Sequence, residues 1–434
     1  MDTVTIPQMQ APVVADVDVL VIGGGPAGVA AAICSAREGA TTLLAERCGY
    51  LGGLATGALV IMLDDMFDGT EITVAGIVDE LQDRLERAGA LVRPSRHELW
   101  RDTPDLRRKW ARWGCLDDRA HAEPFPVAYR SITDVEVAKH VLFQMVSEAR
   151  VAMRLHSWFV QALMEEDAVK GAVFATKAGY QAVRSRVTID ATGDGDVFAS
   201  AGAEHVHGSH IITLPHFFGN VNTEQALDFV EQNPAEAKRL DAEVRRIYGG
   251  SWPYWWQLTT NPGVVWCNCP HMSGYSALSV EDLTYLEVEG RRRIWQVLDF
   301  VRKNYPGFQN AYVARTSDQI GVRQSRLLVG EYTLTAEDIR TRRRFDDAVG
   351  RGKGYYYPYR CFVPKAVDNL LVAGRHCAME PQAQRQAREW PPCMVTGQAV
   401  GTAAALALRS QVKVRDVDVV TLRNRLRAQG VKLS

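Results

Sequence analysis

Short apolar runs rich in β-branched residues recur along the chain, and glycine-rich turns follow several of them. The runs occupy residues 17–22 (VDVLVI), 41–46 (TTLLAE), 187–190 (VTID) and 370–374 (LLVAG). Continuous apolar runs of this length are typical of strands that are buried on both faces of a parallel sheet. Between the first two runs, residues 29–39 (VAAAICSAREG) indicate a helix that ends at a glycine. The pattern predicts a β-turn-α-β unit within a parallel sheet.

Other segments show helical periodicity. Residues 223–247 and 280–304 predict amphipathic helices, the second with Ser279 as its N-cap. Residues 395–408 (VTGQAVGTAAALAL) predict an Ala- and Gly-rich helix that packs closely on its neighbours. Strand–helix alternation at both ends of the chain, with none in the middle, predicts an α/β fold. We expect a Rossmann-like domain with an inserted α+β domain.

A glycine-rich turn joins the first predicted strand to the first predicted helix, with a G-x-G-x-x-G motif at Gly23, Gly25 and Gly28. The first glycine allows the tight turn, the second lets the backbone approach a pyrophosphate, and the third lets the helix pack on the strand. The helix N-terminus adds free N–H groups and a partial positive charge. Glu46, at the end of the second strand, can accept hydrogen bonds from an unphosphorylated ribose, so FAD or NAD is expected. The residues predicted to bind it here are Gly23, Gly25, Pro26, Ala27, Gly28 and Glu46.

A second glycine-rich stretch, residues 47–57 (RCGYLGGLATG), begins directly after that acid. NAD enzymes do not need such a stretch here, whereas in two-dinucleotide-fold flavoproteins it runs past the ribityl chain and the flavin edge. The stretch therefore favours FAD. The residues predicted to take part are Arg47, Gly52, Gly53, Leu54, Ala55 and Thr56.

With these motifs the sequence resembles the FAD-dependent oxidoreductases of the glutathione-reductase-like superfamily. More narrowly, it resembles a bacterial family that carries an E-x(4)-LGG-x-AT stretch. Further blocks match at 188–196 (TIDATGDGD), 319–332 and 369–403. The resemblance implies the fold and the cofactor but is a poor guide to the substrate. The further cofactor contacts that it implies are Ala191, Thr192, Gly193, Asp194, Gly374, Arg375, Thr396 and Gly397.

One position departs from the family pattern. In many relatives the last buried strand ends in Gly-Asp, with the Asp on the ribityl hydroxyls, but here Arg375 follows Gly374. We therefore expect a cation near the pyrophosphate or the flavin. The start of the predicted 395–408 helix, at Thr396 and Gly397, is expected to point at the N1–C2=O edge of the flavin. There it would stabilise the negative charge of the reduced ring.

The predicted FAD-binding domain is discontinuous, because its strands lie far apart in the chain. No second G-x-G-x-x-G follows a strand, so no built-in nicotinamide-nucleotide domain is expected. The predicted division is an FAD-binding domain of 13–60, 130–205 and 362–412, a helical excursion at 61–129, a substrate domain at 206–361 and a C-terminal helix at 413–434.

Composition limits the partners and the location of the protein. The 434 residues are 47% hydrophobic and 23% charged, as in globular proteins. A net charge of -1 argues against nucleic acid and against an anionic membrane as partners. No secretory signal is recognisable, and no apolar stretch reaches the roughly 20 residues of a membrane span, so we expect a cytoplasmic protein. The eight cysteines are sparse, and the spacing of Cys267, Cys269 and His271 does not predict a metal site.

Histidine, arginine and aromatic residues supply the candidates for chemistry. A base with a pKa near neutrality favours His; His376 is placed best by chain order and His271 second, while His205, His207, His210 and His216 cluster elsewhere. Arg323, Arg326, Arg385 and Arg388 can clamp a carboxylate or form structural ion pairs. Clusters of aromatic residues can line a pocket for a ring-shaped substrate, or pack in a core or a subunit interface. The predicted catalytic residues are His376, His271 and Arg375, and the predicted substrate residues are Arg323, Arg388, Trp255 and Tyr356.

The sequence thus predicts an FAD-dependent enzyme that oxidises a small, ring-containing substrate by hydride transfer to flavin N5. Oxygen, a quinone or a carrier protein could each accept the electrons. One alternative is a flavin-dependent monooxygenase fed by external reduced nicotinamide. An alternative of another class is a flavoprotein for RNA modification or nucleotide-dependent binding, against which the net charge argues.

Overall fold

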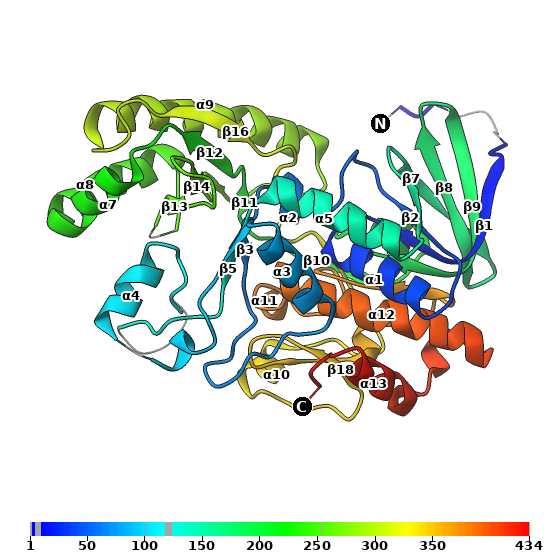
Figure 1. Cartoon of the computed structure of the whole chain (residues 1–434). Coiled ribbons are helices and arrows are strands. Elements are labelled where there is room, and N and C mark those ends of the chain that lie inside the picture. Colours follow the sequence, from blue (N-terminus) through cyan, green and yellow to red (C-terminus); the bar gives the residue numbers. More distant parts are fainter. Residues whose placement is uncertain (1, 5–9, 102, 118–123, 253, 434) are drawn as a thin grey trace.

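The computed structural model of the chain describes residues 2–4, 10–101, 103–117, 124–252 and 254–433. Predictions made for residues 102 and 118–123 of the helical excursion, for 253 of the substrate domain and for 434 lie outside the described residues. Two large clusters of buried hydrophobic side chains organise the rest, and Figure 1 shows the elements around them.

The larger core surrounds a sheet of β1 (Val13–Ile22), β2 (Thr42–Ala45), β6 (Ala152–Arg154), β7 (Trp158–Glu165), β8 (Ala168–Thr176), β9 (Gly179–Asp190) and β20 (Leu370–Val372). The strand order is β6-β2-β1-β9-β8-β7, and β20 pairs with the C-terminal end of β9. β6, β2, β1, β9 and β20 run parallel, whereas β7, β8 and β9 form an antiparallel meander. All four predicted strands are present, and the predicted Rossmann-like α/β fold is confirmed.

Two helices, α1 (Pro26–Arg37) and α12 (Trp390–Ser410), pack against the parallel part of this sheet (Figure 1). α5 (Val135–Glu148) packs on α1, and α3 (Ile77–Arg87) packs on α5 and α12. The backbones of α1 and α12 approach very closely. A Cβ added to Gly397 would lie 2.0 Å from the carbonyl oxygen of Ala27, and one on Gly401 would lie 2.2 Å from that of Ala31. Only glycine fits at these two positions of α12, which explains the small-residue composition of the helix.

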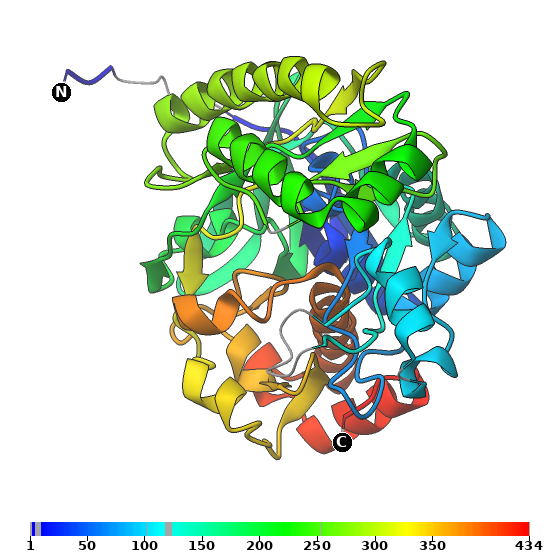
Figure 2. The same ribbon diagram turned by 90° about the vertical axis from the view of Figure 1, so that its left-hand side faces the viewer.

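The smaller core is built from residues between 212 and 322. The elements of this region are β11 (Ile212–Thr213), β12 (His216–Gly219), α7 (Thr223–Gln232), α8 (Pro234–Tyr248), β13 (Gln257–Leu258), β14 (Val265–Cys267), β15 (His271–Met272), α9 (Val280–Asn304) and β16 (Tyr312–Thr316). The preceding strand, β10 (His205–His207), pairs instead with residues 326–328. The main sheet of the smaller core is antiparallel, in the order β13-β14-β12-β16. Figure 2 shows α8 and α9 side by side at the edge of the molecule.

Both helix predictions in this region can be compared with the structure. The helix predicted over 280–304 is confirmed as α9, and the Ser279 hydroxyl accepts a hydrogen bond from the Asp282 N–H. The single helix predicted over 223–247 is wrong, because the chain forms two helices that part at Asn233. Pro234 cannot continue α7, since it lacks an N–H group, but it is well suited to the first turn of α8.

Residues 326–362 return to the larger core. Their elements, and those that follow, are β17 (Arg326–Leu328), α10 (Ala336–Arg340), β18 (Ala348–Arg351), β19 (Tyr356–Pro358), η2 (Tyr359–Phe362), α11 (Pro381–Gln384), η3 (Val414–Asp416) and α13 (Val419–Ala428). Buried side chains from Leu328 to Val363 pack with α12 and the parallel sheet, although the sequence assigned most of them to the substrate domain.

Residues 54–133 contain strands as well as helices, so the excursion is not purely helical. The elements are α2 (Leu54–Gly57), β3 (Met62–Leu63), β4 (Leu91–Val92), η1 (Glu98–Trp100), α4 (Pro104–Ala111) and β5 (Ser131–Thr133), with α3 among them. β3, β5 and β4 form a small antiparallel sheet. Among the described residues, no helix has the length and apolar character needed to cross a bilayer.

Candidate active site

The C-terminal ends of four parallel strands meet at one edge of the large sheet. Ile22 of β1 pairs with Ala45 of β2 and with Asp190 of β9, and Val372 of β20 also pairs with Asp190. The four loops that follow these strands therefore lie together, at the edge where open α/β sheets bind ligands. These loops contain nearly all the residues that the sequence predicts to contact the cofactor.

The turn between β1 and α1 leaves an open cradle. Gly23 has φ +105°, and a Cβ there would lie 2.4 Å from the Ala191 carbonyl oxygen; one on Gly28 would lie 1.7 Å from the Gly23 oxygen. At Gly25, by contrast, an added Cβ would meet no atom within 4 Å. No side chain caps the N-terminus of α1 and its first turn holds no acid, so the partial positive charge there faces open space.

The two glycine-rich loops contact each other at this cradle. The Gly52 N–H donates to the Gly24 oxygen (2.8 Å), and a Cβ on Gly53 would lie 2.9 Å from the Gly25 Cα. Both loops are also held by the buried carboxylate of Glu46. It accepts hydrogen bonds from the Gly24 N–H (2.5 Å) and from the Cys48 N–H (2.7 Å).

The neighbouring Arg47 lies beside the same loops. Its guanidinium group lies over the Trp158 ring (5.3 Å to the centroid) and donates to Gln319 Oε1 (3.2 Å). Burial tends to lower the pKa of Arg47, but the negative charges of Asp194 and Glu46 raise it above its usual value. This cation therefore stays charged next to the cradle.

Asp190, at the end of β9, organises the turn that follows it. One carboxylate oxygen accepts from the Thr192 N–H (3.0 Å) and hydroxyl (2.7 Å), and the other from the N–H groups of Val197 and Phe198 (3.1 and 3.0 Å). His376 Nε2 lies 3.0 Å from the first oxygen, and its ring stacks on Phe198. Burial acts to raise the pKa of Asp190, but His376 and these donors hold it below its usual value.

His376, the first choice for the base, is fully buried in this arrangement. An ionised carboxylate can only accept hydrogen bonds, so Nε2 carries the hydrogen that is shared with Asp190. Nδ1 is buried and makes no hydrogen bond. Neither nitrogen faces open space, so this placement argues for a positioning role rather than for proton transfer with a substrate.

Arg375 does not project as a free cation. It forms an ion pair with Asp194 (2.9 Å) and lies against Gly193, where an added Cβ would be 2.0 Å from Arg375 Nη1. Asp194 also accepts from the Ser325 hydroxyl (2.7 Å). Burial tends to raise the pKa of Asp194, but Arg375 and Ser325 lower it overall, so the pair is charged.

The start of the helix predicted over 395–408 is wrong by five residues. α12 begins at Trp390 rather than at residue 395, because Pro391 and Pro392 fit a first turn in which their missing N–H groups have no helical partner. Thr396 and Gly397 thus lie within the helix, not at its N-terminus. The Thr396 hydroxyl accepts from the Gly374 N–H (2.9 Å), which ties α12 to the loop after β20.

A second group of side chains lies where the segment before α12 meets loops of the smaller core. Gln384 donates to the carbonyl oxygen of Arg323 (2.9 Å) and so joins the two parts. The Arg323 side chain donates to Asn268 Oδ1 (3.3 Å) and lies over the Trp252 ring (5.5 Å). We name this group the arginine seam; it consists of Arg323, Arg388, Glu389, His210, His271, Trp252 and Asn268.

Two histidines of the seam are held neutral. Burial and the charge of Arg323 lower the pKa of His271 to about 4, while its Nε2 lies 3.1 Å from the Asn268 carbonyl oxygen. Burial, Arg388 and Arg323 likewise lower the pKa of His210 to about 4. Near neutral pH both rings are uncharged. Of the two predicted histidine bases, His271 is the one that is partly accessible, whereas His376 is fully buried.

A profile of the family described as "FAD dependent oxidoreductase" matches residues 18–356 and 352–426, which is most of the chain. The chain belongs to this family. It is therefore an FAD-dependent oxidoreductase, as the sequence predicted. None of the curated proteins is significantly similar to it in sequence.

Solved structures share the fold of this oxidoreductase. A geranylgeranyl bacteriochlorophyll reductase-like protein from Thermoplasma acidophilum is 15% identical, with a TM-score of 0.50 over 96% of this chain and 84% of that one. A p-nitrophenol 4-monooxygenase from Pseudomonas putida is 12% identical, with a TM-score of 0.50 over 97% of this chain and 90% of that one. At such low identity these similarities show the fold alone.

The residues of the oxidoreductase fit FAD. The open position at Gly25, the uncapped N-terminus of α1 and the acid at the end of β2 suit a pyrophosphate next to an adenosine ribose. Among the described residues, no group of three or more His, Cys, Asp or Glu side chains could hold a metal ion.

Two of the predicted substrate residues lie outside the seam. Trp255 is 1% exposed in the smaller core, where its Nε1 donates to Asp241 (2.7 Å) and its ring packs on Tyr305 and Phe308. This position fits core packing, the alternative that the sequence left open. Tyr356 is buried in the larger core, and its ring contacts are with arginine side chains of β18 and of the loop before it.

Sequence reasoning missed several residues that organise the site. Asp190 was part of a recognised block, but its five hydrogen bonds were not anticipated. Ser325 and Arg326 hold the 188–196 turn through Asp194 and Asp196, which makes Arg326 a structural ion-pair partner. The only sequence signal for this contact was that the blocks at 188–196 and 319–332 both match the family.

Proposed function

We propose that this oxidoreductase oxidises a small organic substrate by hydride transfer to N5 of FAD, with the substrate held at the arginine seam. The observation that carries the proposal is the accessible, neutral His271, next to a buried guanidinium group and beside the segment that leads into α12. Oxidation of a CH–OH or CH–NH group releases a hydride and a proton. FAD supplies the hydride acceptor when bound.

The chain's own residues would hold the cofactor as follows. The amides at the start of α1 bind the pyrophosphate, because they are uncapped and open at Gly25. Glu46 accepts hydrogen bonds from the adenosine ribose while keeping its bonds to the two glycine-rich loops. Arg375 stays paired with Asp194 and supports the turn at Gly193 rather than acting on the substrate.

The proton would pass to His271. Its ring is neutral at any pH well above about 4 and can accept a proton, although the lowered pKa makes it a weaker base than a solvent-exposed imidazole. Trp252 lies edge-on to this ring, with 5.1 Å between the centroids, and limits how the imidazole can turn. His376 holds Asp190 and the turn after β9, and so positions the cofactor loops.

The monooxygenase alternative stays open because the same fold occurs in a reductase-like protein and in a p-nitrophenol 4-monooxygenase. Purified, FAD-loaded protein separates the alternatives. Under anaerobic conditions, a panel of hydroxy acids, amino acids and neutral alcohols is tested for bleaching of the flavin. Bleaching by one of them, without nicotinamide, supports direct oxidation.

A different set of results would identify a monooxygenase. If no panel member bleaches the flavin, but NADH does so when an aromatic compound is present, and the product carries oxygen from labelled dioxygen, the protein is a monooxygenase. The variant His271→Asn tests the role of His271 if a panel member does bleach the flavin. It should slow that bleaching by roughly 10²–10⁴-fold if His271 is the base, with the FAD content unchanged.

A further inference from the structure

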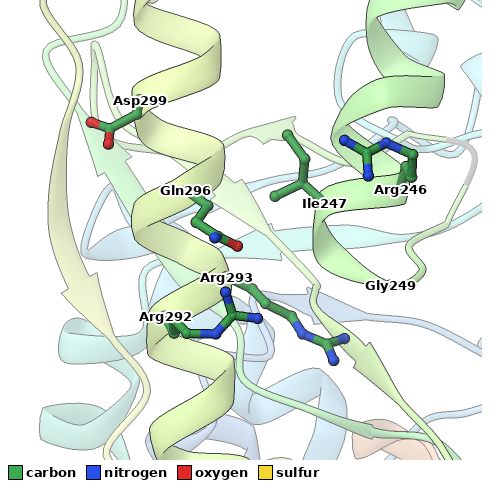
Figure 3. A pocket seen from close by; sticks show the side chains of 7 residues that line it. All are labelled: Arg246, Ile247, Gly249, Arg292, Arg293, Gln296 and Asp299. Carbon is green, nitrogen blue, oxygen red and sulfur yellow. The ribbon is translucent and has the colours of Figure 1, made fainter.

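Arginine side chains lie close together at several places among the described residues, and two of these groups differ in the acidic partners that compensate them. The first is a surface pocket of about 570 Å³ between the C-terminal end of α8 and the middle of α9. Figure 3 shows Arg292 and Arg293 extending from α9, with Arg246 on α8 opposite them. Arg246 pairs with Glu243, and both arginines of α9 pair with Glu289. This pocket therefore carries no surplus of buried positive charge.

The arginine seam differs because its central cation is buried and incompletely bonded. Arg323 is only 8% exposed, and no carboxylate of the described residues forms an ion pair with it. Its Nη2 has a single long bond to an amide oxygen, and its Nη1 is buried without a hydrogen-bond partner. Nε of Arg388 is buried and unpartnered as well. Buried charged donors without partners are costly, and they indicate that a ligand completes the site.

The charges of the seam define the ligand further. Arg388 and Glu389 are the charged groups that act most strongly on Arg323, and they pair with each other at 3.3 Å. Two guanidinium groups and one carboxylate leave one positive charge, since both histidines are neutral. Arg385 is exposed to solvent and contributes little, because water screens its charge. A single buried positive charge matches a monoanion better than a dianion.

The geometry of the guanidinium donors and of the rings beside them also favours a carboxylate. A guanidinium group has two parallel N–H donors that match the two oxygens of a carboxylate. The Trp252 ring lies over Arg323 and is itself 44% exposed, so it offers a partly solvent-exposed apolar surface next to the guanidinium group. The His271 ring packs edge-on against the Trp252 ring.

We propose that the substrate is an organic monocarboxylate, whose carboxylate binds Arg323 and Arg388 and whose carbon skeleton lies along Trp252 toward His271. The inference rests on the proposed function for the statement that this ligand is the substrate. The evidence for an acid-binding site is the set of buried guanidinium N–H groups without partners, and it does not depend on whether the ligand is oxidised.

The test measures binding by titration calorimetry on FAD-loaded protein, with benzoate and hexanoate as probes and benzamide and hexanamide as uncharged matches. Each acid should bind at least about tenfold more tightly than its amide, because only the acid forms charge-assisted hydrogen bonds with the guanidinium groups. In Arg323→Met the advantage of the acid should be lost. Arg323→Lys should retain part of it, since it keeps the charge but not the paired donors.

Arg292→Met is the matched control, since Arg292 lines the other arginine pocket and is paired with Glu289. Binding of both probes should be unchanged in it. Equal affinities of acid and amide in the wild-type protein would overturn the inference, and this comparison requires no variant. Tighter binding of inorganic phosphate than of either acid would also overturn it, because the site would then favour a dianion.

The two proposals fail in different ways. Selective binding of acids, with no bleaching of the flavin by any hydroxy or amino acid, would contradict the oxidation reaction but retain the acid site. Bleaching by neutral alcohols, without any preference for acids, would contradict the acid site but retain the oxidation reaction. The FAD content of each preparation, read from its visible absorbance, shows that the variants are folded and loaded.

Discussion

Replacing His376 by alanine is expected to destabilise the turn that follows β9 and to weaken the retention of FAD. The variant removes one of the five hydrogen bonds to the fully buried carboxylate of Asp190. It also removes the ring that stacks on Phe198, with centroids 5.7 Å apart. The turn that Asp190 holds continues into Gly193 and Asp194, which lie at the edge where the cofactor loops meet.

The expected loss can be calculated from these contacts. A hydrogen bond to a charged group contributes about 1.5–3 kcal/mol, and an aromatic stack adds about 0.5–1.5 kcal/mol. The four remaining donors keep Asp190 solvated by the protein, so the larger cost of a wholly unpaired buried charge does not apply. His376→Ala should therefore lower the free energy of unfolding by roughly 2–4.5 kcal/mol.

Glutamine at the same position separates the two roles of His376. Its amide can donate to Asp190 but cannot act as a base, so His376→Gln should recover about half of the lost stability. The assay is chemical denaturation together with the temperature at which FAD fluorescence is released, with the exposed His207→Ala as control. If both variants keep wild-type stability and FAD but are reduced 10²–10⁴-fold more slowly, on the order expected for a lost base, the positioning role is refuted.

Three further predictions follow from the glycine cradle, the smaller core and a buried histidine. Gly25→Val should give a folded but colourless protein, because the added side chain enters the open space proposed for the pyrophosphate. Gly28→Ala should impair folding, because its Cβ would lie 1.7 Å from the Gly23 oxygen. FAD content and circular dichroism distinguish the two outcomes. Trp255→Phe should lower stability without changing the affinity for benzoate, since this ring lies in the core; a weaker calorimetric affinity would place it at the substrate. Burial lowers the pKa of His216 to about 4, below its usual value, so the unfolded state takes up the proton first as the pH falls. The contribution of His216 to stability should therefore fall by about 2 kcal/mol between pH 7 and pH 5. Denaturation at the two pH values should show a drop that is smaller by about this amount in His216→Gln than in the wild-type protein.

The cofactor loops were largely predictable because their signals are local. The spacing of Gly23, Gly25 and Gly28 and the acid at Glu46 fall within one strand-turn-helix-strand unit, and parallel strands bring their C-terminal ends to one edge. The start of α12 was not predictable in the same way. Two prolines obscured its first turn, although a helix start tolerates them.

The roles of individual charged side chains depended on partners far away in the sequence. Asp194 and Ser325 are 131 positions apart, and Arg326 binds the same turn, so nothing near these residues in the chain identified Arg326 as a structural cation. Arg323, three residues earlier, has the same side chain and lies in the same block. Its surroundings depend on how the smaller core packs against the segment before α12. Only the tertiary structure therefore shows that Arg323 is buried with an unpartnered nitrogen.

The sequence by itself determined the fold class, the cradle at the start of α1 and the choice of FAD, because glycine spacing and hydrophobic runs act over short stretches of chain. The tertiary structure decided which histidine is enclosed and which is accessible, and which arginine has an acidic partner and which does not. Those properties are set by burial and by charge neutralisation, and both depend on which distant segments come into contact.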